Sequence, residues 1–177
     1  MKSIVEQLAM YSCYHRDGRN VVTHMIGIPL IVISLLALLS RPEWIVGYVF
    51  ITPAIVITVI GVIYYSMLDT VLGFIMAVIL ALCIWLASWI AALSTQMWIA
   101  VGVSFFIVGW ILQFVGHAYE GRKPAFVDDI MGLVIGPLFV VAELVFLLGF
   151  NKPLYLAVEN RVAELLTKMP LASKRRN

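Results

Sequence analysis

The sequence predicts an all-α integral-membrane protein, a polytopic bundle of transmembrane helices in one domain. Three observations predict it: 63% of the 177 residues are hydrophobic, only 12% are charged, and the apolar residues form long runs. Soluble domains carry about 25% charged residues, so half that value indicates a chain whose surface faces lipid. A helix needs about 20 apolar residues to cross a bilayer, and the chain supplies four predicted spans of about that length.

The four spans follow one another with short connections, as in an antiparallel bundle. Residues 21–40 form the first span, which the turn Arg41-Pro42-Glu43 closes. Residues 44–67 form the second. Residues 70–119 contain no Asp, Glu, Lys or Arg and are long enough for two crossings. The break between these two is predicted at residues 94–96, between two tryptophans that suit the aromatic belt of a membrane interface.

The final third of the chain predicts a less regular structure. Residues 130–150 are long enough to cross, but Gly136-Pro137 interrupts them and Glu143 lies within them, so we expect a broken or re-entrant fifth hydrophobic segment. Residues 151–177 predict an interfacial amphipathic helix and a basic tail, and residues 1–20 a weaker interfacial segment before the bundle of residues 21–150.

Charge and cysteine content exclude several classes of protein. The net charge of +2 and the lack of a basic stripe argue against a nucleic-acid partner. Cys13 and Cys83 are too far apart in sequence to predict a zinc module or a disulfide framework. No cleavable signal peptide is evident, so the first span is expected to stay as an anchor. Lys and Arg near the spans predict a cytoplasmic N-terminus and a cytoplasmic 120–128 segment.

A cluster of ionisable residues follows the uncharged run, in the segment QFVGHAYEGRKPAFVDD. Its His117 ends the fourth predicted span and His24 lies one turn into the first, so both belong at the same rim of an antiparallel bundle. His15 precedes the first span in the stretch YHRDGRN, where Asp17-Gly18 predicts a turn and Asn20 a helix N-cap. All three histidines of the chain are therefore predicted to meet at one rim.

A metal site is the functional interpretation of this cluster. Glu120 follows His117 by three residues and shares its helix face. Two histidines, one carboxylate and open positions are typical of non-haem Fe(II) oxygenases, and ionisable residues in a membrane are functional candidates because they are costly there. A structural interpretation stays open, in which the histidines cap helices, Glu120 pairs with Arg122 or Lys123, and Asp128 is an N-cap.

Other chemistries stay open on the same residues or are disfavoured. A zinc hydrolase could use the same site, and a bis-histidine haem electron carrier could use His24 and His117 as axial ligands. A small transporter is disfavoured because the middles of spans two to four hold no charged residue. The motifs GxSxG, P-loop and GxGxxG are absent.

At these residues the chain resembles the membrane 2-hydroxy fatty acid dioxygenases. YHRDGRNVVTHMIGIP is similar to the first signature of that family, QFVGHAYEGRKPAFVDD to the second and GPLFVVAELVF to the third. Together the three signatures run from residue 14 to residue 146. One departure is visible, because the family usually has Pro where this chain has Gly18. That difference loosens the loop that carries His15 and removes no candidate ligand.

The resemblance implies an Fe(II)-dependent dioxygenase that shortens 2-hydroxy fatty acids by one carbon, with O2 as co-substrate and membrane lipid around the bundle. The family's histidines carry over to His15, His24 and His117 as metal ligands. We add Glu120 and Asp128 as candidate carboxylate ligands or catalytic groups, and we expect the substrate to contact Arg16, Asn20 and Arg122. The active site is expected at the cytoplasmic face, of the inner membrane in a bacterium or of the endoplasmic reticulum in a eukaryote.

Overall fold

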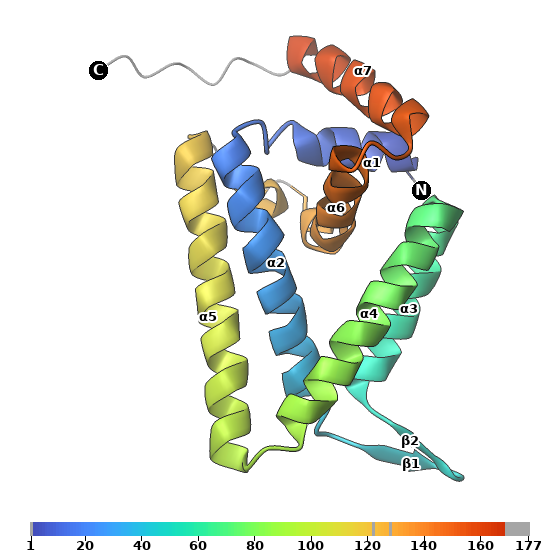
Figure 1. Cartoon of the computed structure of the whole chain (residues 1–177), viewed down its shortest axis with the longest axis vertical. Coiled ribbons are helices and arrows are strands. Elements are labelled where there is room, and N and C mark those ends of the chain that lie inside the picture. Colours follow the sequence, from blue (N-terminus) through green and yellow to red (C-terminus); the bar gives the residue numbers. More distant parts are fainter. Residues whose placement is uncertain (1, 122, 128, 169–177) are drawn as a thin grey trace. The chain divides into compact units, whose positions relative to one another are not determined.

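The computed structural model describes residues 2–121, 123–127 and 129–168, and helices dominate it (Figure 1). The elements in chain order are α1 (Ile4–Ser12), α2 (Gly18–Leu39), β1 (Trp44–Val46), β2 (Val49–Ile51), α3 (Pro53–Leu68), α4 (Thr70–Ala91), α5 (Thr95–Glu120), the 3-10 helix η1 (Ala125–Val127), α6 (Met131–Leu147) and α7 (Lys152–Lys168). The predicted helical, membrane-like fold class is confirmed. α2, α4 and α5 are each long and apolar enough to cross a bilayer, and α6 and α7 meet that test as a bent pair.

The chain packs as two compact units, residues 1–23 with 114–177 and residues 24–113. Both boundaries fall inside a helix, between Thr23 and His24 of α2 and between Gln113 and Phe114 of α5. Each of these helices is continuous across its boundary. The residues just before and just after a boundary are therefore related by ordinary helix geometry.

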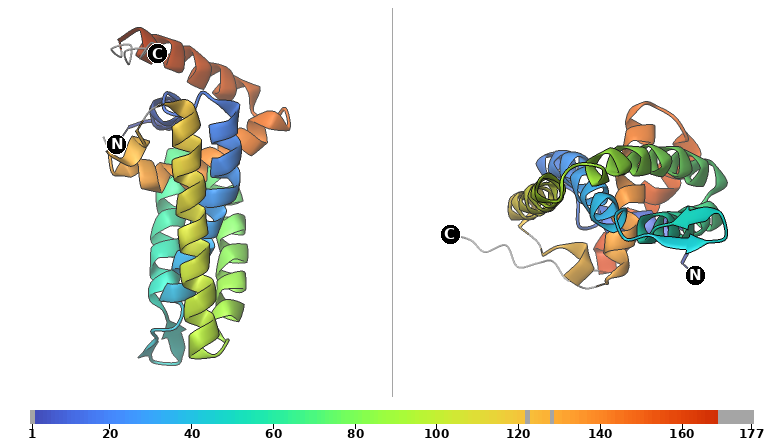
Figure 2. Two further views of the ribbon diagram at one scale, coloured as in Figure 1. Left: turned by 90° about the vertical axis from the view of Figure 1, so that its left-hand side faces the viewer. Right: turned by 90° about the horizontal axis from the view of Figure 1, so that it is seen from below.

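In the second unit, α2 and α5 contact each other backbone to backbone. A Cβ on Gly27 would lie 2.9 Å from the carbonyl oxygen of Gly109, and a Cβ on Gly109 would lie 2.8 Å from that of Gly27. Small residues at such a crossing let two membrane helices approach closely. Further along the pair, Ser34 Oγ donates to the Gly102 carbonyl at 2.7 Å. The helices lie side by side in all views, and this pairing sets them antiparallel (Figures 1 and 2).

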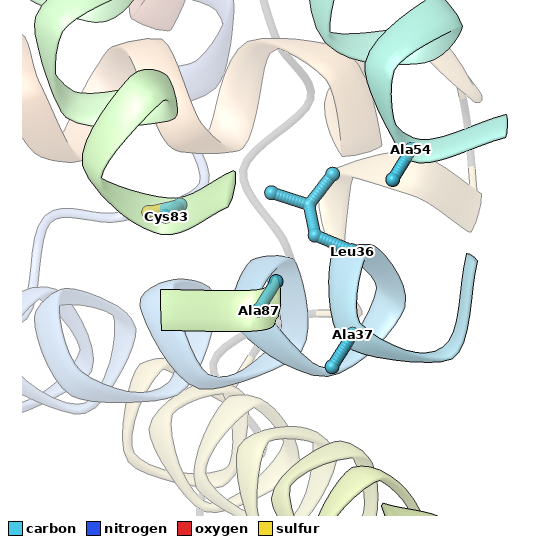
Figure 3. Close-up of a cluster of buried hydrophobic side chains, with 5 residues drawn as sticks. All are labelled: Leu36, Ala37, Ala54, Cys83 and Ala87. Atoms are coloured by element: carbon cyan, nitrogen blue, oxygen red, sulfur yellow. The ribbon is translucent and has the colours of Figure 1, made fainter. Parts of the chain in front are cut away.

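The same unit has a small apolar core where the C-terminal half of α2 meets α3 and α4 (Figure 3). Its buried side chains are Leu36, Ala37, Ala54, Cys83 and Ala87. α3 and α4 also approach closely beside their connection, where a Cβ on Gly73 would overlap the backbone of Ser66. Asp69 joins the two helices and caps α4 by accepting a hydrogen bond from the Leu72 N–H at 2.8 Å.

The prediction of one helix over residues 44–67 is wrong. Residues 44–51 form an antiparallel hairpin, and α3 begins only at Pro53. Proline cannot continue a helix from upstream but suits its first turn, and Thr52 before it is extended and caps the helix through the Ile55 N–H. Gly47 has a φ of 64° in the turn, and the strands are rich in β-branched and aromatic residues. The predicted connection between the third and fourth spans is confirmed, since α4 ends at Ala91 and α5 begins at Thr95.

In the first unit, α1 packs against α6 and α7. The predicted amphipathic helices are confirmed, because α1 buries Leu8 and Ala9 while α7 buries Val158 and Val162. The break predicted at Gly136-Pro137 is wrong: α6 runs through it, held by a series of buried apolar side chains that outweighs the cost of one proline. The chain turns after α6 instead, where Gly149 and Asn151 have positive φ, and α7 departs at 118°.

Candidate metal centre

His15 lies three residues after the end of α1 and packs back against that helix. Its Nδ1 lies 2.8 Å from the carbonyl oxygen of Tyr11, and its ring stacks on the Tyr11 ring at 4.1 Å and 3°. The Phe139 ring of α6 lies 5.5 Å away, and only 4% of His15 is exposed. A carbonyl can only accept, so Nδ1 carries the proton and Nε2 keeps the lone pair that a metal requires. The tautomer and the ring plane of His15 are thus set by α1 itself.

His117 approaches His15 from the end of α5. The two rings lie 5.0 Å apart in an edge-to-face arrangement, and 6% of His117 is exposed. Because His117 lies one turn before the C-terminus of α5, its position depends on how α5 packs on α2. The glycine contact between these helices sets that packing.

His24 lies on α2, one turn after Asn20, and only 1% of it is exposed. Its position relative to the first turn of α2 is fixed by the unbroken helix. His15, His24 and His117 each offer one ring nitrogen, and these nitrogens lie within 4.8 Å of one another. The predicted convergence of the histidines is therefore present in the structure, and this group of described residues contains no carboxylate.

Glu120 instead anchors the loop that carries His15. Its Oε1 accepts the Arg16 N–H at 3.0 Å, and its Oε2 accepts the Asp17 N–H at 2.8 Å. The Asn20 side chain donates to the same Oε2 at 3.1 Å and to the carbonyl of Tyr14 at 3.2 Å. One carboxylate thus ties the end of the helix that holds His117 to the segment that follows His15.

The N-cap predicted at Asn20 is wrong. α2 begins two residues earlier, at Gly18, and Asp17 takes the capping role by accepting the Arg19 N–H at 2.9 Å. Hydrogen bonds from the side chain and the backbone of Arg19 lower the pKa of Asp17 to about 2. The amide of Asn20 is thereby available inside the first turn of α2, where it reaches Glu120.

Arg16, a predicted substrate contact, forms an ion pair in the first unit. Its Nη1 and Nη2 lie 2.9 and 3.3 Å from the two carboxylate oxygens of Glu159 on α7. α7 is also tied to α1, because Arg161 Nε lies 2.6 Å from Glu6 Oε2. That hydrogen bond lowers the pKa of the Glu6 carboxyl. Arg122 and Asp128, two further predicted site residues, lie outside the described residues.

Three residues near the histidines were not predicted as site residues. Tyr11 and Phe139 frame the His15 ring, and Gln113 lies one turn before His117 on α5. Only 6% of Gln113 is exposed. The four-residue spacing from His117 was a usable signal for Gln113, since it places both side chains on one helix face. Phe139 lies in the third signature segment, GPLFVVAELVF, but no spacing to a histidine connects it with the site, which it reaches through tertiary packing.

Comparison with known proteins bears out the resemblance drawn from the motifs. The family model described as "2-hydroxy-palmitic acid dioxygenase Mpo1-like" matches residues 1–148, which include all three histidines and end before α7. A Saccharomyces cerevisiae (strain ATCC 204508 / S288c) protein named 2-hydroxy-palmitic acid dioxygenase MPO1 is 33% identical over 156 residues. That alignment covers 87% of this chain and 86% of the yeast protein. No solved structure matches the chain.

Proposed function

The chain belongs to the 2-hydroxy-palmitic acid dioxygenase Mpo1-like family, and from that premise we propose that it is an iron-dependent membrane dioxygenase that shortens 2-hydroxy fatty acids by one carbon. The sequence similarity to a protein named as a dioxygenase supports the proposal that this chain is an enzyme acting on 2-hydroxy fatty acids. The observation that carries the proposal is the group of three buried imidazoles, whose nitrogens lie within 4.8 Å of one another.

The donor set fits a ferrous ion. Imidazole is a good ligand for iron, and His15 has the tautomer that coordination needs. When bound, iron would supply the redox chemistry that allows O2 to react with the hydroxy acid. Imidazoles also suit zinc, so a zinc hydrolase remains the second candidate, and the dioxygenase relative favours iron over it. A third histidine within 4.8 Å of the other two disfavours a bis-histidine haem, whose macrocycle needs the space around its axial ligands.

Among the remaining predicted residues, the contacts bear on the proposed roles of Glu120, Asn20 and Arg16. Glu120 and Asn20 position the histidine loop, and this fits their hydrogen bonds better than metal ligation by Glu120 does. Arg16 is proposed to pair with the substrate carboxylate, since a guanidinium binds carboxylates in a bidentate manner and already does so with Glu159. Arg122 as a second carboxylate contact and Asp128 as a catalytic group remain proposals from the sequence.

The reaction balances without an external reductant. A 2-hydroxy acid, R–CH(OH)–COOH, and one O2 give the shortened acid R–COOH, one CO2 and one H2O, so the substrate supplies every electron that O2 accepts. The carbon–carbon bond between the carboxylate and the hydroxyl carbon breaks. The three histidines are buried, so bulk water has little access to their ring nitrogens.

The substrate suits the proposed place of the site. A 2-hydroxy fatty acid has a charged head and a long apolar tail, so it lies with its head at a membrane surface. The histidines lie near the N-terminal end of α2, where Arg16 precedes the helix and Arg19 lies in its first turn, and excess Lys and Arg mark a cytoplasmic face. We therefore place the active site at the cytoplasmic face of the membrane, the inner membrane in a bacterium or the endoplasmic reticulum in a eukaryote.

Metal analysis and turnover of the purified protein test the proposal together. Protein purified without O2 should contain iron, and with 2-hydroxypalmitate it should consume O2 and release the acid one carbon shorter. His24→Ala and His117→Ala should each lose iron and activity while still inserting into the membrane, because insertion depends on apolar length. His15→Ala should lose iron too if His15 is a ligand. Full activity in either of the first two variants, or zinc with hydrolytic activity in the wild type, would overturn the proposal.

A further inference from the structure

Gln113 of α5 is a buried polar side chain without a hydrogen-bond acceptor among the described residues. Its Nε2 is shielded from solvent, and no acceptor lies within bonding distance in the part of the chain that the structure describes. Most buried side-chain polar groups are paired, because a buried donor left unpaired costs free energy that is not recovered. An unpaired amide in a membrane helix therefore indicates a group whose acceptor arrives from outside the chain.

The amide lies one helical turn from two of the histidines. It packs over Gly27 of α2, where a Cβ would overlap Nε2. Gly27 follows His24 by three residues, and Gln113 precedes His117 by four. Gly18 begins α2 and Glu120 ends α5, so these two residues mark one end of the antiparallel pair. Measured along the helices from that end, His24 and His117 come first and the Gln113 amide comes one turn later. Glycine at position 27 is what leaves room for the amide there.

We propose that Gln113 is the subsite for the hydroxyl group of a 2-hydroxy carboxylic acid, with Nε2 donating a hydrogen bond to the hydroxyl oxygen. This rests on the proposed function and names the residue that recognises the substrate class. In a bound amphiphile the carboxylate is outermost and the hydroxyl carbon comes next toward the tail. The amide, one turn inward from His24 and His117, lies on the side toward which the tail leaves.

The subsite explains selection of 2-hydroxy acids over ordinary fatty acids. An unsubstituted acid offers no acceptor at the second carbon, so the buried amide stays unpaired in its complex. Sites built to bond a substrate hydroxyl reject analogues that lack it, because the protein donor is then left without a partner. Because the amide is neutral, it provides this donor without adding a charge beside the metal ion of the proposed site.

Binding measured without O2 tests the subsite through a readout separate from turnover. Wild-type protein and Gln113→Met, which keeps the length of the side chain, would be titrated in nanodiscs with 2-hydroxypalmitate and with palmitate. The wild type should prefer the hydroxy acid, and the variant should lose about 10-fold of that preference, the size expected when a buried donor is involved. Without ligand, Gln113→Met should melt no lower than the wild type, because the substitution removes an unpaired buried donor.

Ser34→Ala is the matched control, since Ser34 is a buried polar residue whose hydrogen bond to Gly102 on α5 is already made. It should show the opposite pattern, a lower melting temperature with unchanged ligand preference. An unchanged preference in Gln113→Met, or lower stability without a change in binding, would make Gln113 structural and overturn the subsite alone. A wild type that neither binds nor turns over 2-hydroxypalmitate would overturn the subsite and the proposed function together.

Discussion

Among single residues, Glu120 was predicted as a metal ligand, but its contacts favour a role in positioning the loop after His15. Both of its carboxylate oxygens accept hydrogen bonds, from the backbone of Arg16 and Asp17 and from the side chain of Asn20. These donors belong to the segment directly after His15, and Glu120 itself lies on the helix of His117. Groups that orient metal ligands in this way are commonly important for metal affinity.

Glu120→Gln separates positioning from ligation. The amide keeps one acceptor but turns an N–H₂ group toward a backbone N–H, so the loop of residues 14–17 should exchange its amide hydrogens faster. Iron affinity should fall about 10–100-fold and remain measurable. Glu164→Gln, which removes an exposed carboxylate that pairs with Arg161 on α7, should change neither quantity. Complete loss of iron with unchanged hydrogen exchange would instead identify Glu120 as a ligand.

Among the individual elements, α3 is a short apolar helix, and we expect the hairpin before it to make up for its length. α3 has 16 residues and is about 24 Å long, less than the roughly 30 Å of a hydrocarbon core. The hairpin precedes α3 in the second unit, and the large apolar side chains that it exposes include Trp44, Ile45, Tyr48 and Phe50. An isolated two-stranded hairpin is only marginally stable in water, and a strand with unpaired backbone groups is not tolerated in the hydrocarbon core. We therefore expect the hairpin to lie at the boundary between the lipid headgroups and the acyl chains.

A spin label at Tyr48→Cys measures the depth of the hairpin. Tyr48 lies in the turn of the hairpin and is fully exposed, so a label there disturbs no packing. In nanodiscs we expect it to be relaxed more strongly by O2 than by a water-soluble nickel complex. Ser94→Cys, in the polar turn between α4 and α5, is the reference and should show the reverse. Equal access of the nickel complex to both labels would contradict membrane insertion of the hairpin.

At the scale of the whole molecule, orientation in the membrane follows from the distribution of basic residues. Lys2 and Arg16 lie before α2 and Arg19 lies in its first turn, whereas Arg41 is the basic residue of the loop after it. Cytoplasmic loops carry the excess of Lys and Arg. The N-terminus and the segment after α5 are therefore expected on the cytoplasmic side, with the α4–α5 turn opposite.

Cysteine labelling tests this orientation. Gly18→Cys and Lys123→Cys should both react with an impermeant reagent added from the cytoplasmic side, and Ser94→Cys only from the other side. A Cβ at Gly18 meets no atom within 4 Å, and the native Cys13 and Cys83 are buried, so background reaction should be low. Reaction of positions 18 and 123 from opposite sides would be incompatible with a common site for the three histidines.

The features that depend on local pattern could be predicted from the amino-acid sequence. Apolar length predicted α2, α4 and α5, and helical spacing of apolar residues predicted α1 and α7. The convergence of three histidines also followed, because antiparallel spans bring the start of the first beside the end of the last. Their function as metal ligands stays a prediction. Gly47 and Pro53 were local signals for the hairpin. The prediction of one helix over residues 44–67 gave more weight to the continuous apolar run and was therefore wrong.

Features that depend on contacts between distant residues could not be predicted and became visible in the folded structure. α6 continues through Pro137 because its buried face packs well, and the chain turns at Gly149 and Asn151 instead. Glu120 accepts hydrogen bonds from residues about a hundred positions away, so no local pattern could distinguish positioning from ligation. The same holds for Gln113, because the lack of an acceptor for its amide among the described residues is a property of the packed helices. Hydrogen-bond partners depend on how distant segments pack in the fold, whereas the length of a helix and the period of its apolar residues depend on residues that are neighbours in the sequence.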